Sequence, residues 1–205
     1  MIKNKMKPQL YRIAAFPLNI VVLPGEEVPL RIFEPRYKQL INECMEYSLP
    51  FGIPYMSKGI MTEIGSEVEV VNIIGRNDID DMVIMIKGKS IFKTKDFFPE
   101  LPNKMYGGIV AEAMLNDFGT TNPELAKMVK TLKLNLSPDL GTLIISNEIN
   151  MLDVARSLML KSEEKYKVLT INDKKAREQF IINRLRFVEL IKNQEKKLEN
   201  NFQLN

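Results

Sequence analysis

The pattern of hydrophobic and polar residues divides the chain into a strand-rich first part and a helical second part. In the first part, short apolar runs and period-two alternation predict a series of strands. These strands are expected at Gln9–Ala15, Phe51–Met56, Glu67–Ile73, Met82–Ile86, Ser90–Lys93 and Tyr106–Met114. A hairpin loop is expected at Asn77–Asp81, and a turn at Lys87-Gly88-Lys89. Successive strands with a single early helix indicate an antiparallel barrel or folded sheet.

The early helix is predicted to run from Glu34 to about Tyr47. Pro35 suits its first position, where the missing N–H costs nothing. One helical face carries the apolar residues, which are Tyr37, Leu40, Ile41, Cys44 and Met45. Before this helix we expect a short extended run at Ile20–Leu23, a turn at Pro24-Gly25, and a charge cluster of Arg31, Glu34 and Arg36.

The second part follows a turn-like linker, Phe118–Pro123, and its apolar spacing predicts four helices. Asn122 is expected to cap the first helix, Ser162 to begin the third and Asn172 to cap the fourth. The apolar stripes of the first, second and fourth helices are Leu125, Met128, Val129 and Leu132; Met151, Leu152, Ala155, Leu158 and Met159; and Ile181, Leu185, Val188, Ile191 and Leu198. We therefore expect two domains, residues 1–118 and 119–205, the second a four-helix bundle.

Length and composition are those of a globular protein with a sizeable core, since the chain has 205 residues of which 45% are hydrophobic. The net charge of +3 is too small to indicate nucleic acid or an anionic membrane by itself. No apolar run is long enough to cross a bilayer, and no apolar signal core follows the lysines of Met1–Lys7. A cytoplasmic location is therefore expected.

The chain contains no histidine and one cysteine. The missing histidine excludes Ser-His-Asp and Cys-His nucleophilic sites, HExxH zinc sites and all histidine-ligated metals. Cys44 cannot form an internal disulfide, and we expect a buried structural thiol. Carboxylate chemistry, Ser-Lys chemistry or no chemistry remain, and no cofactor or metal is expected.

Three motifs are better explained by structure than by chemistry. Gly88-Lys89-Ser90 resembles the end of a phosphate-binding loop, but Val83 stands where that loop needs a glycine. Asp78, Asp80 and Asp81 lack the glycine and later glutamate of a calcium loop, so we expect a solvated hairpin tip. Glutamates interrupt the basic residues of 173–199, which indicates a solvated helix face rather than a nucleic-acid surface.

The stretch from Phe16 to Tyr37 resembles the signature of the Lon protease N-terminal domain, the substrate-binding part of that ATP-dependent protease. The similar pieces are Phe16-Pro17-Leu18, Leu23-Pro24-Gly25, Pro29–Phe33, Glu34–Tyr37, Phe51-Gly52-Ile53, Ile64-Gly65, Leu152–Ala155 and Glu164–Leu169. The chain departs from the family pattern at Leu23, Glu67 and Ile91, where phenylalanine, a small or apolar residue, and arginine are usual. The resemblance implies an α+β fold, with a PUA-like pseudobarrel followed by the helical bundle.

The resemblance also implies a non-enzymatic module, because we find no phosphate loop and no room for the ATPase and Ser-Lys peptidase parts of Lon. Its partners would be exposed hydrophobic segments of unfolded or degron-bearing polypeptides. A more specific hypothesis is that the protein acts as an adaptor that works with a protease. The expected peptide-binding residues are Phe16, Leu18, Phe33, Phe51, Met56, Ile60 and Met61.

Two other functions stay open at this point. PUA-like folds also bind RNA or small ligands, but a basic strand with interleaved aromatic residues is missing here. A hydrolase with a carboxylate site ranks last, since no pair of carboxylates is convincingly placed. Neither membrane nor nucleic acid is an expected partner, and the sequence does not determine the oligomeric state.

Overall fold

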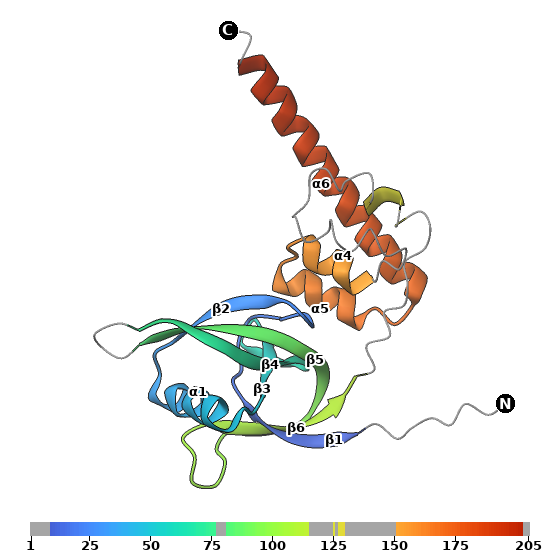
Figure 1. Cartoon of the computed structure of the whole chain (residues 1–205). Coiled ribbons are helices and arrows are strands. Elements are labelled where there is room, and N and C mark those ends of the chain that lie inside the picture. Colours follow the sequence, from blue (N-terminus) through green and yellow to red (C-terminus); the bar gives the residue numbers. More distant parts are fainter. Residues whose placement is uncertain (1–8, 77–80, 115–124, 126, 130–150, 203–205) are drawn as a thin grey trace, which may run out of the picture. The chain divides into compact units, whose positions relative to one another are not determined.

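A computed structural model describes residues 9–76, 81–114, 125, 127–129 and 151–202 of the chain (Figure 1). The chain divides into two compact units, residues 1–116 and 117–205. The elements of the first unit are β1 (Leu10–Ala15), β2 (Glu27–Ile32), α1 (Pro35–Tyr47), β3 (Phe51–Ser57), β4 (Ile60–Arg76), β5 (Met82–Phe98) and β6 (Gly107–Ala113). Those of the second unit are α4 (Met151–Ser157), α5 (Ser162–Thr170) and α6 (Lys174–Phe202). The expected boundary between residues 118 and 119 lies outside the described residues and stays a prediction.

The first unit is built on one six-stranded sheet with the order β2-β5-β4-β3-β1-β6. Because β6 pairs with β5 as well as with β1, the strands from β5 to β6 close into a ring. Among the described strands, β2 pairs only with β5, and it extends the sheet beyond this ring. The mixed α+β class is confirmed, whereas the PUA-like description and the four-helix bundle stay predictions.

The sequence pattern did not predict β2. This strand pairs with the first residues of β5, and Pro29 lies opposite Met85. A proline cannot donate to a ladder, but it is tolerated on a strand with a free outer edge. The prolines at 24 and 29 therefore concealed a strand that is stabilised by a partner 50 to 60 positions away.

Gly88 lies within a strand, so the turn expected at Lys87-Gly88-Lys89 was wrong. β5 runs without interruption from Met82 to Phe98, with a bulge opposite Glu67 and Val68. The N–H of Gly88 donates to the carbonyl of Glu26, and the Gly88 carbonyl accepts from the N–H of Gly25. A Cβ atom at position 88 would lie 2.2 Å from the carbonyl oxygen of Leu23. A glycine is therefore needed at position 88 so that the 23–26 turn can approach the backbone of β5 closely.

The strand expected at Phe51–Met56 is confirmed as β3, and a tight hairpin joins it to β4. Its two central residues, Lys58 and Gly59, have φ of 50° and 79°. Positive φ at both positions is characteristic of a type I′ turn, which matches the twist of the flanking strands. Met56 and Met61 are paired across this hairpin.

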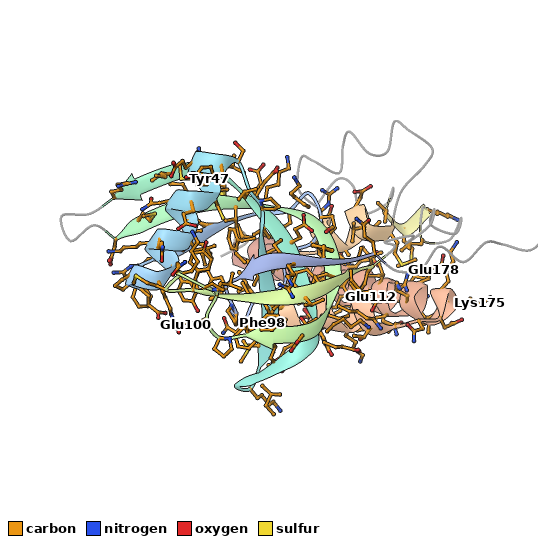
Figure 2. The ribbon with its side chains drawn as sticks, turned by 90° about the horizontal axis from the view of Figure 1, so that it is seen from below. Tyr47, Phe98, Glu100, Glu112, Lys175 and Glu178 are labelled. Carbon is orange, nitrogen blue, oxygen red and sulfur yellow. The ribbon has the colours of Figure 1, made fainter. Side chains whose placement is uncertain are left out.

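The main core of the first unit lies between α1 and the sheet. The helix begins at Pro35, as predicted, and buries Tyr37, Leu40, Ile41 and Cys44. The ring of Phe16 stacks on Tyr37 with the centroids 3.6 Å apart. Met45, expected on the same face, is 41% exposed, and Tyr47 is exposed at the end of the helix (Figure 2). A smaller cluster of Ala15, Phe92, Ile109 and Ala111 packs separately.

The charge cluster expected at the start of α1 forms only in part. Arg36 pairs with Glu34 at 2.6 Å, but Arg31 pairs with Asp81 at 2.8 Å. Lys38 also lies 3.5 Å from the Asp81 carboxylate, which is only 10% exposed. Asp81 was expected at a solvated hairpin tip, and this expectation was wrong. Asp78 and Asp80 lie outside the described residues.

In the second unit, α4, α5 and α6 bury an apolar set that comprises Met151, Val154, Ala155, Val168, Leu169, Ile181, Ile182 and Leu185. The cap of α6 is Asp173, whose Oδ2 accepts from the N–H of Ala176 at 2.7 Å, rather than the neighbouring Asn172. Ile191 is 38% exposed, and Met159 follows the end of α4 with 88% exposure. Most of the helix expected after Asn122 lies outside the described residues, although Leu125 and Val129 are buried. No helix in the described ranges is long and apolar enough to cross a membrane.

Candidate functional site

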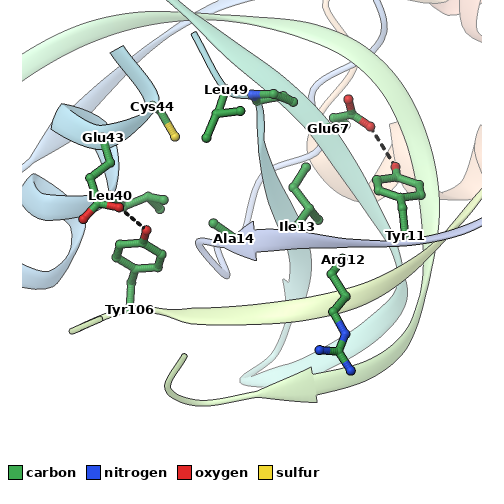
Figure 3. Close-up of a pocket in the computed structure, with 11 residues that line it drawn as sticks. Tyr11, Arg12, Ile13, Ala14, Leu40, Glu43, Cys44, Leu49, Glu67 and Tyr106 are labelled. Carbon is green, nitrogen blue, oxygen red and sulfur yellow. Dashed lines mark hydrogen bonds between the residues drawn. The ribbon is translucent and has the colours of Figure 1, made fainter. Parts of the chain in front are cut away.

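A cavity of about 240 Å³ opens in the first unit, where β1 separates from β3 (Figure 3). These two strands are paired only at Ala15 and Gly52. Upstream of this pair, β1 forms one wall with residues 11–14, and α1 forms the other with Leu40, Glu43 and Cys44. The volume lies below the roughly 300 Å³ at which pockets for drug-sized ligands begin. The cavity therefore suits one side chain or a small group.

The edge of β1 that faces this cavity carries unpaired backbone groups. The carbonyl of Gln9 accepts from Ala113 on β6, and the N–H of Phe16 donates to Gly52 on the opposite side. Backbone direction alternates along a strand, so the N–H and C=O of Arg12 point away from β6. Within the described part of the chain, no strand pairs with Arg12 on that side. Its guanidinium is directed away from the other lining side chains (Figure 3) and lies 5.9 Å from the Phe98 ring centre.

Glu67 is the carboxylate at the β4 side of the cavity. Its Oε2 accepts hydrogen bonds from the Tyr11 hydroxyl at 2.7 Å and from the Ser90 hydroxyl at 3.0 Å. Burial, followed by the hydrogen bond to Glu67, raises the pKa of Tyr11 well above its ordinary value. Tyr11 therefore stays protonated and acts as a donor. Among the ion pairs of the described residues, Glu67 has no cationic partner.

Glu43 is the second carboxylate of the cavity, and its partners are complete. Its Oε2 accepts from Lys104 Nζ and from the Tyr106 hydroxyl, each at 2.6 Å, and its Oε1 accepts from Gln39 at 3.0 Å. The Lys104 hydrogen bond, with that of Tyr106, lowers the pKa of Glu43 below its ordinary value. Burial raises the pKa of Tyr106, and the bond to Glu43 adds to this effect. This cluster ties α1 to the segment before β6.

Cys44 lies in the wall of the cavity, buried as predicted. Burial raises the pKa of its thiol to about 12. The thiolate is the nucleophilic form of cysteine, and at neutral pH this group is protonated. In the described ranges, no three His, Cys, Asp or Glu side chains gather closely enough to hold a metal ion.

None of the seven residues expected to bind peptide lines this cavity. Phe16 and Phe51 belong to the main core, with 5% and 0% exposure, and Leu18 packs against it. Met56 and Met61 are partly buried partners across the β3–β4 hairpin. Phe33 and Ile60 are open to solvent, with 58% and 72% exposure. The seven residues as one groove stay a prediction.

Sequence reasoning missed the cavity because its walls come from distant segments. The one available signal was Glu67, where a small or apolar residue is usual in the family that the chain resembles. Alternation placed Glu67 in a strand, but nothing local indicated that Tyr11 donates to it from 56 positions away.

Comparison with solved structures identifies the fold. The crystal structure of a Lon N-terminal domain protein from Xanthomonas campestris is similar with a TM-score of 0.65 and 20% identity, covering 84% of this chain and 98% of that one. The N-terminal domain of Mycobacterium avium complex Lon protease is similar with a TM-score of 0.61 and 14% identity, covering 86% of this chain and 98% of that one. No curated protein sequence matches the chain.

A family model supplies the assignment at the level of sequence. The model of the ATP-dependent protease La (LON) substrate-binding domain matches residues 12–186. This match contains β2 to β6, every residue that lines the cavity except Tyr11, and α1, α4, α5 and the first part of α6. It supports a role in substrate binding. The chain therefore belongs to the LON substrate-binding domain family.

Proposed function

We propose that this protein binds extended segments of other polypeptides without acting on them chemically. The observation that carries the proposal is the free edge of β1 beside the cavity. Backbone N–H and C=O groups at such an edge can pair with any extended chain, whatever its sequence. This form of recognition suits a protein whose ligands share little besides an unfolded backbone.

Exposed apolar side chains would add affinity. Ile60 stands at the tip of the β3–β4 hairpin, with the thioethers of Met56 and Met61 beside it. Flexible thioethers adapt to ligands of different shape. Burying apolar area contributes about 25 cal/mol per Å², so a few such contacts give modest affinity. Unfolded or degron-bearing polypeptides are the proposed ligands. A more specific version of the proposal is that the protein delivers these polypeptides to a protease.

The chemistry of the cavity favours binding over catalysis. Glu43 is saturated by Lys104, Tyr106 and Gln39, so it is not poised to exchange a proton. The thiol of Cys44 is protonated at neutral pH because its pKa is raised to about 12. The chain contains no histidine to serve as a base.

The test compares two substitutions at Arg12. Arg12→Pro removes the N–H that faces the cavity but leaves the ladder to β6 intact, whereas Arg12→Ala removes only the outward side chain. A short, unstructured, fluorescein-labelled peptide rich in apolar residues is titrated by anisotropy. We expect Arg12→Pro to weaken binding about threefold to tenfold, the effect of one lost hydrogen bond, and Arg12→Ala to leave it unchanged.

Equal affinity of both variants and the wild-type protein would show that peptides do not use the β1 edge. If no peptide binds while a labelled RNA does, polypeptide binding is wrong. Thermal melts of both variants show whether each is folded at the temperature of the titration.

A further inference from the structure

Glu67 is a half-buried carboxylate without an ion pair among the described residues, unlike Glu43, Asp81 and Glu69. Glu43 is paired with Lys104, and Asp81 with Arg31 and Lys38. Even Glu69, two residues along the same strand, lies 3.1 Å from Lys89. Within the described residues, Glu67 has hydroxyl donors only. A carboxylate that is partly withdrawn from water is stabilised by a cation or by hydrogen-bond donors, and the described donors to Glu67 are two neutral hydroxyl groups.

Glu67 lines the cavity, and one of its two carboxylate oxygens has no hydrogen-bond donor among the described residues. Both hydroxyl donors use Oε2, and no described residue donates to Oε1. Figure 3 shows Glu67 at one end of the cavity, with Ile13 between it and Ala14. Leu49 adds an apolar wall from the segment that precedes β3. The site therefore combines apolar walls with two carboxylates, of which Glu43 is already paired with Lys104 and Glu67 has no cation among the described residues.

This shape matches a long basic side chain. Lysine and arginine bury their methylene stems along apolar surfaces while the charged end seeks a polar partner. A volume of about 240 Å³ admits one such side chain, not a larger ligand. Residues 11–14 of β1 line the cavity, so the backbone of a segment that fills it would run along β1.

We propose that the cavity beside Glu67 takes the lysine or arginine side chain of an extended polypeptide segment paired with β1. This inference rests on the proposed polypeptide binding and adds a preference to it. A glutamate or aspartate at the same position of the segment meets a like charge and is rejected. A neutral polar side chain binds between these extremes.

The experiment uses three labelled peptides that differ only in their central residue, which is lysine, glutamine or glutamate. Each is titrated by fluorescence anisotropy against the wild-type protein, Glu67→Gln and the matched control Glu69→Gln. The control removes a carboxylate from the same strand, but one that already has Lys89 as a partner. We expect the wild-type protein to bind the lysine peptide about tenfold more tightly than the glutamine peptide.

In Glu67→Gln this ratio should fall to about one, while affinity for the glutamine peptide stays the same. Glu69→Gln should keep the wild-type ratio, apart from the weak long-range effect that added salt screens. Equal affinities of the three peptides for the wild-type protein would overturn the inference, and so would a preference that survives in Glu67→Gln. Both results leave polypeptide binding in place, whereas a failure of all three peptides to bind contradicts the proposed function itself. The ranking on the wild-type protein decides the question even if Glu67→Gln is poorly folded.

Discussion

Arg31 donates a hydrogen bond of 2.8 Å to Asp81, a residue 50 positions further along the chain. Arg31 lies in β2, and Asp81 directly precedes β5, the one described strand that pairs with β2. Lys38 of α1 approaches the same carboxylate to 3.5 Å. A single side chain thus joins the outer strand, its partner and the helix.

Replacing Asp81 should reduce stability in a pH-dependent way. The hydrogen bond from Arg31 lowers the pKa of Asp81 below its ordinary value, so the carboxylate stabilises the folded state above the unfolded pKa of about 4. This stabilisation is lost as the pH falls through the lower, folded pKa. Asp81→Asn should therefore unfold at lower denaturant concentration near neutral pH, and the difference from the wild-type protein should shrink under acid conditions.

Glu100→Gln is the control for Asp81→Asn, because Glu100 is exposed and has no ion pair among the described residues (Figure 2). Urea unfolding at several pH values measures both variants. If the difference in unfolding free energy between Asp81→Asn and the wild-type protein stays constant across the acid range, Asp81 acts through its shape and not through its charge.

Gly88→Ala should destabilise the first unit. The added Cβ would lie 2.2 Å from the backbone oxygen of Leu23, so the 23–26 turn or β5 must shift. Overpacking of this kind typically costs about 1–3 kcal/mol of unfolding free energy. Gly75→Ala is the matched control on the neighbouring strand, since its Cβ would meet no atom within 4 Å. If denaturant unfolding gives the same loss of unfolding free energy for both variants, the close approach of the 23–26 turn to Gly88 is contradicted.

Leu40→Ala should also lower the free energy of unfolding, by about 2–5 kcal/mol, because it truncates a side chain with 1% exposure. Met45→Ala changes a residue of the same helix that is 41% exposed, and we expect a much smaller effect. Thermal melts followed by circular dichroism compare the two. An unchanged melting temperature for Leu40→Ala would place this face of α1 at the surface.

The paired change Ile60→Ser and Met61→Ser should weaken peptide binding with little effect on the melting temperature. Ile60 is 72% exposed at the hairpin tip, so its loss removes no core contact. Central anchors of an interface typically contribute more than about 1 kcal/mol each. Val71→Ser, at a position 48% exposed on the same strand, controls for lost apolar surface. Unchanged affinity with reduced stability would show that the hairpin tip serves folding.

Local patterns in the sequence predicted the elements whose stabilisation is local. Pro35 marks the first turn of α1, and the alternation around residue 70 marks β4. Both signals are readable because the periodicity of a helix or a strand appears in the order of neighbouring side chains. Gly88 and Asp81 were misinterpreted for the opposite reason. Each is explained by a distant partner, Leu23 for the glycine and Arg31 for the aspartate, and no local pattern identifies such partners.

The candidate site was less accessible to sequence reasoning than the fold. The sequence correctly placed Met56, Ile60 and Met61 on either side of the Lys58-Gly59 turn, although Phe51 turned out to be core. The cavity requires Tyr11 to lie beside Glu67, which depends on the register of β1 against β6 and on the early separation of β1 from β3. Register of strands distant in sequence is set by the assembled sheet.

The closed ring of strands constrains the order of folding. β1 begins at Leu10, which pairs with Glu112 of β6. The first strand of the ring therefore cannot form its ladder with β6 until the last strand of the ring has been synthesised. Until β6 emerges from the ribosome, β1 and the second half of β5 both expose unpaired edges, the surfaces through which nascent chains associate. Contacts so distant along the chain also slow the search for the native arrangement. A chain released before Gly107 should therefore aggregate, whereas one that extends through Ala113 can close its ring.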